Sequence, residues 1–289
     1  MKVTGFSFIR NARIYDYPVT EAIRSVLPVC DEFIVAVGNS VDDTLTLIKN
    51  IDPKIRIVET IWDDTLRQGG EVLAKETDKA FHAVSEDTDW CFYIQGDEVV
   101  HEKYLDNIRK EMEKWKDDAS VDGLLFHYLH FYGSYNYTGI SSAWYPKEVR
   151  IIKNNKRIYS YRDAQGFRKN QNEKLNVKLI DAYVYHYGWV REPKAMQLKA
   201  ENFNKLWHDD SWIDKNIIKT EAYDYHQKAE ALRLFTDTHP AVMHDRVKAR
   251  NWDFDHDVTA NDLSFKEKFK KFAANNLMLD LSYKNYKLI

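Results

Sequence analysis

Short apolar runs and amphipathic segments alternate along the first hundred residues. Four apolar runs have the length and the branched or aromatic content of buried strands: 6–9, 33–37, 55–58 and 90–94. Between them, three segments place apolar residues at helical spacing: 19–27, 42–48 and 70–84. This alternation predicts an α/β fold, with a mostly parallel sheet and helices on both of its faces.

The order of the elements changes after residue 100. A charged helix is predicted at 102–116, and strands are predicted at 123–129, 149–152, 156–159 and 180–187. Asn154 and Asn155 are typical turn residues, so the strands on either side of them are expected to pair as a hairpin. Beyond Pro193 the pattern is polar and helical, which predicts a helical C-terminal extension over 196–289, packed on the core.

The charge balance and the cysteine content argue against several classes of protein. The 289 residues hold 42 Lys and Arg against 45 Asp and Glu, which argues against a nucleic-acid binder held by phosphate contacts. Two cysteines, Cys30 and Cys91, are too few for a disulfide framework or a cysteine-rich zinc site. The sequence shows no membrane-spanning apolar run and no evident secretory signal, so a cytoplasmic protein is expected.

An acidic turn follows the fourth predicted strand, at the end where open parallel sheets bind their ligands. It consists of Gln95, Gly96, Asp97 and Glu98. Adjacent side chains of an extended chain point to opposite sides, so Asp97 and Glu98 are expected to have different roles. Carboxylates suit Mg²⁺ or Mn²⁺, and such a cation would stabilise a nucleotide diphosphate as a leaving group. An ordinary acidic turn is the alternative.

Four segments in the first two-thirds of the chain resemble the motifs of one protein family and occur in the same order along the sequence: 8–12, 30–44, 95–98 and 185–189. On these segments the chain resembles bacterial family 2 glycosyltransferases of the GT-A fold. The resemblance implies a GT-A-like catalytic domain over 1–195. Its nucleotide-binding half would be 1–100, and its acceptor-binding half would be 101–195.

The same resemblance implies a metal-dependent glycosyltransferase of cell-surface glycan biosynthesis. It would move a sugar from a UDP-, GDP- or dTDP-linked donor to a hydroxyl of a glycan or lipid-linked acceptor, and inversion is the family-level expectation. A nucleotidyltransferase is one alternative, although 10–13 do not form a glycine-rich phosphate loop. A degenerate, non-catalytic carbohydrate-binding protein is another.

Residue roles follow from the family's acidic Asp-X-Asp motif. Asp97 resembles its last, metal-binding acid, whereas Gln95 stands in place of the first acid. Val37 replaces an Asp that holds the nucleotide base in many relatives. Nucleotide-sugar contacts are expected from Asn11, Asn39, Asp42, Gln95, Asp97 and Arg150. The alternatives are a turn-former for Asn11, a helix cap for 39–44 and a surface ion pair for Arg150.

His186 lies where a late histidine often completes the metal shell of GT-A enzymes. The resemblance therefore pairs His186 with Asp97 as ligands of Mn²⁺ or Mg²⁺. An imidazole beside carboxylate and phosphate oxygens suits Mn²⁺. The alternative is a buried histidine bonded to the backbone.

An inverting transferase needs a base that takes the proton of the acceptor hydroxyl. Asp163 lies where relatives often carry an acidic loop, so it is the first candidate. Glu98, beside the metal turn, is the second. An ion pair of Asp163 with Arg162 or Arg168 is the alternative.

Aromatic side chains make up 14% of the chain and concentrate at 126–145. Within that segment, 133–139 has the composition of a loop. Rings stack on sugar faces, so Tyr132, Tyr135 and Trp144 are predicted to line the acceptor side of a cleft. Near the end of the chain, phenylalanines of 265–272 share one helical face among lysines. This pattern predicts either a surface helix or peripheral contact of 264–289 with the inner face of a membrane.

Overall fold

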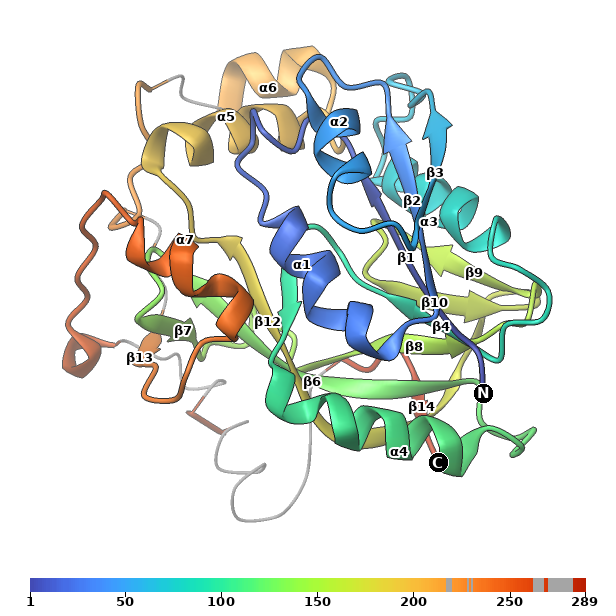
Figure 1. Cartoon of the computed structure of the whole chain (residues 1–289). Helices are drawn as coiled ribbons and strands as arrows, with labels where there is room; N and C mark the ends of the chain where they lie inside the picture. Colours follow the sequence, from blue (N-terminus) through green and yellow to red (C-terminus); the bar gives the residue numbers. More distant parts are fainter. Residues whose placement is uncertain (217–219, 228, 230, 262–267, 270–282) are drawn as a thin grey trace.

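The computed structural model describes residues 1–216, 220–227, 229, 231–261, 268–269 and 283–289. Within them, one sheet contains eleven strands. These are β1 (Val3–Ile9), β2 (Glu32–Gly38), β3 (Ile55–Thr60), β4 (Trp90–Tyr93), β5 (Glu98–Val100), β6 (Gly123–Tyr132), β7 (Tyr137–Gly139), β8 (Lys147–Lys153), β12 (Asn176–Trp189), β13 (Leu232–Leu234) and β14 (Lys287–Leu288). The main path of the sheet runs β13-β7-β6-β8-β4-β1-β2-β3 (Figure 1).

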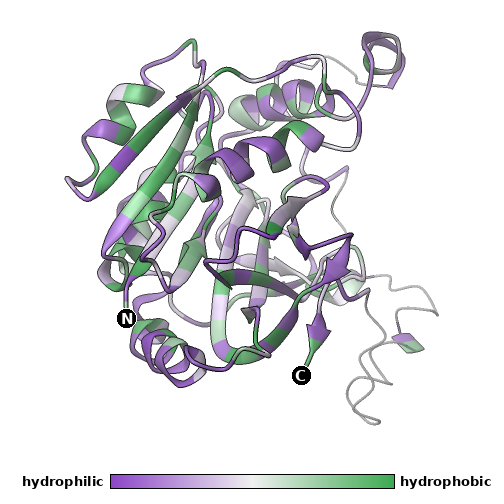
Figure 2. Cartoon of the chain, turned by 90° about the vertical axis from the view of Figure 1, so that its right-hand side faces the viewer, coloured by the Kyte–Doolittle hydropathy of each residue, from purple (hydrophilic) through white to green (hydrophobic). Residues whose placement is uncertain are grey.

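The first half of this sheet is parallel, as the sequence predicts. β1 pairs with β2 and β4, and β2 pairs with β3, always in parallel. Helices α1 (Val19–Val26), α2 (Thr44–Lys49) and α4 (Leu105–Trp115) pack on one face, and α3 (Glu71–His82) packs on the other. Residues 33–37 of β2 are therefore buried, and hydrophobic residues concentrate on the central strands (Figure 2). The predicted α/β fold, with helices on both faces of a largely parallel sheet, is confirmed.

Strand β12 connects a late part of the chain to the acidic turn. It pairs in parallel with β6 and antiparallel with β5, the strand that begins at Glu98. This register places His186 opposite Glu98 on one side and opposite His130 on the other. The pairing with β6 becomes irregular between His186 and Trp189. Residues that are distant in sequence therefore meet beside the turn after β4.

The predicted hairpin about Asn154 and Asn155 is not formed. β8 already pairs with β4 on one edge and with β6 on the other. Because a strand has only two edges, the following strand must find another partner. β9 (Ile158–Tyr161) pairs instead with β10 (Gly166–Lys169), and β11 (Glu173–Lys174) completes a separate three-stranded sheet.

The C-terminal extension differs in part from the predicted helical segment. It contains α5 (Pro193–Asn204), α6 (Asp210–Asn216) and α7 (His244–Lys248). It also contributes β13, which pairs with β7, and β14, which pairs with β12. The extension is therefore helical in places and adds strands to the large sheet elsewhere.

The predicted membrane contact of 264–289 falls mostly on 264–267 and 270–282, which lie outside the described residues. The described end of that segment, 283–289, includes β14. Of the helices that the structure describes, none is both long enough and apolar enough to cross a membrane.

Candidate active site

A cavity of about 1180 Å³ opens at the carboxyl ends of β1 and β4. Residues that follow both strands line it, together with residues of α5, α6 and the segment between these helices. Five of the predicted site residues belong to the lining: Asn11, Gln95, Asp97, Asp163 and His186. This position follows the general rule that open parallel sheets bind ligands beyond the carboxyl ends of their strands.

Asp97 forms the centre of a buried charge cluster in this cavity. Its Oδ2 accepts a hydrogen bond from the Lys199 ammonium at 3.1 Å and lies 3.8 Å from Nη2 of Arg191. Its Oδ1 lies 3.8 Å from Nε2 of His186. Burial alone would raise the pKa of Asp97, but the positive charges of Lys199 and Arg191 outweigh this effect and hold the pKa well below its ordinary value. Asp97 is therefore ionised at neutral pH.

Two histidines beside Asp97 form a hydrogen-bonded pair. Nε2 of His130 lies 2.8 Å from the carbonyl oxygen of Tyr145, which can only accept, so this nitrogen carries a proton. Burial lowers the pKa of His130 to about 3 and that of His186 to about 4, so both rings are neutral. Nδ1 of His130 then accepts a hydrogen bond from Nδ1 of His186 at 3.0 Å. The unprotonated Nε2 of His186 is left on the side of Asp97.

Lys199 and Arg191 are site residues that the sequence analysis did not identify. The Lys199 ammonium also donates to the carbonyl oxygen of Gly188 at 2.8 Å. Burial and the nearby Arg191 lower the pKa of Lys199 to about 8, and Asp97 limits the decrease. Arg191 lies two residues beyond the 185–189 segment, which could have drawn attention to it. Lys199 lies in a polar helix that carries no motif, so the sequence offers no comparable signal for it.

The arrangement around Asp97 does not fit a resident divalent cation. Asp97 and His186 supply two donors, and the described part of the chain contains no group of three or more His, Cys, Asp or Glu side chains placed to hold a metal. The ammonium of Lys199 lies 3.1 Å from Oδ2 of Asp97. A metal ion bound to this oxygen would therefore lie close to the positive charge of Lys199, which would repel it. The side chains therefore provide positive charge of their own where the resemblance implies Mn²⁺ or Mg²⁺.

Glu98 and Arg150 form a closed ion pair beneath the turn. The guanidinium donates to both carboxylate oxygens, at 2.8 Å from Nε and 2.7 Å from Nη2, and the Tyr128 hydroxyl donates to Oε1 at 2.8 Å. Both charged side chains are fully buried, and neither lines the cavity. The predicted roles of Glu98 as a base and of Arg150 as a phosphate ligand are therefore corrected, because no ligand in the cavity can reach them.

Asn39 and Asp42 support the backbone around the first strand. Oδ1 of Asn39 accepts from the backbone N–H of Trp62 at 3.1 Å. Oδ2 of Asp42 accepts from the backbone N–H groups of Arg13 and Ile14, both at 3.0 Å. Asn39 and Asp42 line a separate cavity of about 440 Å³ at the ends of β2 and β3. The alternative of a structural role, in bracing the turn before α2, fits these contacts best.

Asn11 and Gln95 belong to the main cavity but are partly committed to the backbone. Asn11 has a left-handed backbone with φ of 55° and accepts from the N–H of Val41 at 2.9 Å. Nε2 of Gln95 donates to the Tyr93 hydroxyl and to the carbonyl oxygen of Ala164, each at 3.1 Å. The contact with Ala164 ties the acidic turn to the loop that carries Asp163.

Asp163 lies between β9 and β10 and reaches the cavity from the small sheet. Both flanking residues, Arg162 and Ala164, have positive φ angles of 56° and 62°, so the loop turns sharply on either side of it. Burial raises the pKa of Asp163 above its ordinary value. Arg168, one of the ion-pair partners considered for Asp163, donates to the carbonyl oxygens of Phe167 and Asn285. The placement of Asp163 is suitable for a proton acceptor.

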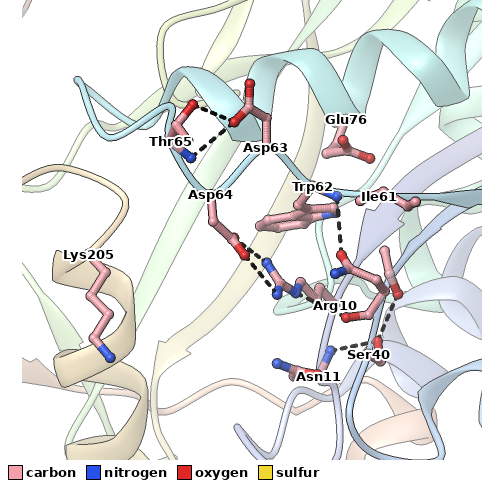
Figure 3. A network of polar contacts seen from close by, with 12 residues as sticks. Arg10, Asn11, Ser40, Ile61, Trp62, Asp63, Asp64, Thr65, Glu76 and Lys205 are labelled. Atoms are coloured by element: carbon pink, nitrogen blue, oxygen red, sulfur yellow. Dashed lines mark hydrogen bonds and ion pairs between the residues drawn. The ribbon is translucent and has the colours of Figure 1, made fainter.

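Two paired arginines also line the cavity. Arg10 donates to both carboxylate oxygens of Asp64 at 2.6 and 3.3 Å, beside the ring of Trp62 (Figure 3). Nη2 of Arg67 donates to Asp210 of α6 at 2.7 Å. The second pair links the loop after β3 to the helical extension across this side of the cavity.

The predicted acceptor-side aromatics do not face the cavity. Tyr132 and Tyr135 are each 3% exposed and pack within aromatic clusters, and Trp144 does not belong to the lining either. The supposed loop at 133–139 is largely buried and includes β7. The aromatic residues that do line the cavity are Phe8, Tyr15, Tyr17, Trp62, Tyr145, Trp189, Phe203, Trp207, Trp212 and Tyr223.

Comparisons with known proteins give remote likenesses. No protein-family model matches the chain, and no curated protein does. The crystal structure of S. aureus TarS is 15% identical with a TM-score of 0.41, and the match covers 70% of this chain and 39% of TarS. TarS 1-349 in complex with UDP-GlcNAc is 16% identical with a TM-score of 0.41, covering 76% of this chain and 68% of that one.

A third likeness is to glucosyl-3-phosphoglycerate synthase of Mycobacterium tuberculosis, in complex with Mn²⁺, UDP and glucosyl-3-phosphoglycerate. It is 17% identical with a TM-score of 0.30, and the match covers 45% of this chain and 44% of that one. At such identities and TM-scores these proteins do not define the function of this chain.

Proposed function

We propose that this protein is a glycosyltransferase that moves a sugar from a nucleoside-diphosphate sugar to a hydroxyl of a glycan or lipid-linked acceptor, with inversion. The observation that carries the proposal is the composition of one cavity. At the carboxyl ends of β1 and β4 it combines an ionised Asp97, an accessible Asp163 and many aromatic rings. Aromatic rings can stack on sugar faces while polar groups bind the sugar hydroxyls, so the combination suits a polyhydroxylated ligand. The resemblance of the segments around these strands to family 2 glycosyltransferases supports the same function.

The chemical step follows from the two sides of the cavity. The donor diphosphate lies against the turn after β4, and Asp163 approaches from the small sheet. The acceptor oxygen attacks the anomeric carbon, and its proton passes to the carboxylate of Asp163. The bond between that carbon and the diphosphate oxygen breaks, and its electron pair stays on the departing nucleoside diphosphate. The raised pKa of Asp163 brings its proton affinity closer to that needed at neutral pH.

Asp163→Asn tests this role. We expect turnover to fall by about a hundredfold to ten-thousandfold because the general base is lost, with little change in donor affinity. The assay measures release of the nucleoside diphosphate from a panel of UDP-, GDP- and dTDP-sugars with glycan acceptors. Asp181→Asn, which changes an exposed residue of β12, is the matched control and should keep full turnover.

Two outcomes would contradict the proposal. Unchanged turnover in Asp163→Asn would remove Asp163 as the base. If the unaltered chain released nucleoside diphosphate from none of the donors yet bound the glycans, non-catalytic carbohydrate binding would replace transfer as its function.

A further inference from the structure

Positive charge exceeds negative charge in the cluster around Asp97. Lys199 and Arg191 each carry one positive charge, and Asp97 carries one negative charge. The neutral tautomers of His130 and His186 add none. The balance leaves one positive charge in a largely buried place, where an uncompensated charge is costly. An anionic group bound in the cavity would offset it.

Lys199 has a hydrogen-bond donor available for such an anion. An ammonium carries three N–H groups. One binds Oδ2 of Asp97 and another binds the carbonyl oxygen of Gly188. The third has no hydrogen-bond partner among the described residues, and Lys199 lines the cavity. The two contacts hold the ammonium in place while leaving one donor for a ligand.

Arg191 adds a second positive charge beside Asp97. It is fully buried, and its Nη1 donates to the carbonyl oxygen of Tyr15. Its Nε and Nη2 have no hydrogen-bond partner within the described part of the chain. Its guanidinium lies 4.7 Å from the ring centroid of Tyr17, and the Lys199 ammonium lies 5.2 Å from the same centroid. A buried guanidinium with unused donors adds positive potential beside the same oxygen of Asp97 that Lys199 contacts.

We propose that Lys199, backed by Arg191, binds the diphosphate of the donor and performs the task of a divalent cation, so that this chain transfers sugar without a metal. This inference rests on the proposed function. When the bond between the anomeric carbon and the diphosphate oxygen breaks, the electron pair remains on that oxygen. The ammonium of Lys199 stabilises the resulting charge, and Asp163 takes the acceptor proton. Asp97 then serves to hold Lys199 in position.

Titration calorimetry of the full chain tests the assignment. The probes are UDP, GDP and dTDP, each in excess EDTA and again with MnCl₂ in place of EDTA. We expect at least one of them to bind with similar affinity in both buffers. In EDTA, Lys199→Met should weaken that binding by about tenfold to a hundredfold because one charge-assisted hydrogen bond is lost. Lys199→Arg, which keeps the charge, should retain most of the affinity.

Lys194→Met is the matched control. It removes a lysine from the same helix, but the Lys194 side chain is 62% exposed and that of Lys199 is 13% exposed. Lys194 is not part of the cavity lining, so its removal should leave the affinity unchanged.

The remaining outcomes distinguish failure of the role of Lys199 from failure of the proposed function. Binding that requires MnCl₂, or full affinity of Lys199→Met in EDTA, would overturn the role of Lys199 and leave the proposed function standing. Absence of binding by all three probes in both buffers would overturn both. The comparison of buffers uses the unaltered chain, so it holds even if Lys199→Met does not fold.

Discussion

Asp97 and Glu98 are neighbours in one turn, but their surroundings differ completely. Glu98 meets one guanidinium that binds both of its oxygens, and this closed pair is fully buried away from the cavity. Asp97 meets two cationic side chains at one oxygen, faces a histidine with the other and lines the cavity. The negative charge of Glu98 is paired with one positive charge, whereas the negative charge of Asp97 faces two. The Glu98 carboxylate is neutralised by Arg150, and this pair supports the fold. The two cations around Asp97 exceed its single negative charge, and the excess positive charge can bind an anionic ligand.

The largest effect is expected from breaking the closed pair. Glu98→Gln removes the carboxylate that pairs with both arms of the buried Arg150, which should lower the free energy of unfolding by about 3–5 kcal/mol. Denaturant unfolding followed by circular dichroism measures the change. The double variant Glu98→Met with Arg150→Met should recover much of the loss, because no isolated charge remains buried. A cost of the single variant no greater than that of an exposed substitution would contradict the structural role of the pair.

A smaller effect is expected from the matched change at the neighbouring residue. Asp97→Asn should lower the free energy of unfolding by roughly 1–3 kcal/mol. The expected cost is smaller than for Glu98 because, among the described residues, the Asp97 carboxylate has one side-chain hydrogen bond, from Lys199, whose ammonium lies at the cavity and can turn toward water. Arg191 lies 3.8 Å from this carboxylate, beyond hydrogen-bond distance, whereas Arg150 binds both oxygens of Glu98. The same unfolding experiment compares the two variants directly. Equal costs at the two positions would remove the contrast between a closed pair and an open cluster.

The smallest effect is a dependence of stability on pH. In the folded protein the pKa of His186 is lowered to about 4, whereas an unfolded histidine titrates near 6.5. Between these values the unfolded chain binds more protons, so stability falls as the pH falls through this window. The slope contributed by one such group is at most about 1.4 kcal/mol per pH unit.

His186→Asn should reduce this slope in urea unfolding measured from neutral pH to about pH 4. The lowered pKa of Asp97 acts in the same direction, but only below the ordinary carboxyl range, so the two contributions separate. His130 keeps part of the slope, since its pKa is lowered as well. An unchanged slope in His186→Asn would show that His186 does not fold in the neutral form.

Local sequence patterns predicted the parallel half of the fold well. The apolar runs became β1 to β4, and the helical spacings became α1, α2 and α3, because each pattern is decided by neighbours in sequence and by burial. Strand pairing was harder to predict. The turn residues Asn154 and Asn155 indicated a hairpin, but β8 had both edges occupied by β4 and β6. Which edges are free is a property of the whole sheet.

The candidate site shows the same division. Asp97, His186 and Asp163 could be proposed because each lies near the end of a predicted strand or in a marked loop. Lys199 reaches Asp97 across 102 residues of sequence, and only the packing of α5 over the turn after β4 brings them together. The aromatic segment 126–145 was misleading for a related reason, since composition does not tell which rings face inward. Tyr132 and Tyr135 turned out to be core residues.

Position 188 has little freedom to mutate. A Cβ atom on Gly188 would lie 2.5 Å from Nε2 of His186 and 3.0 Å from Oδ2 of Asp97, in the space between these two side chains. Even alanine would push them apart, although it changes no charge and no backbone hydrogen bond. Substitutions at Gly188 should therefore be less well tolerated than substitutions at less crowded positions of β12. In an alignment of related sequences, we expect glycine at this position wherever Asp97 and His186 are both kept.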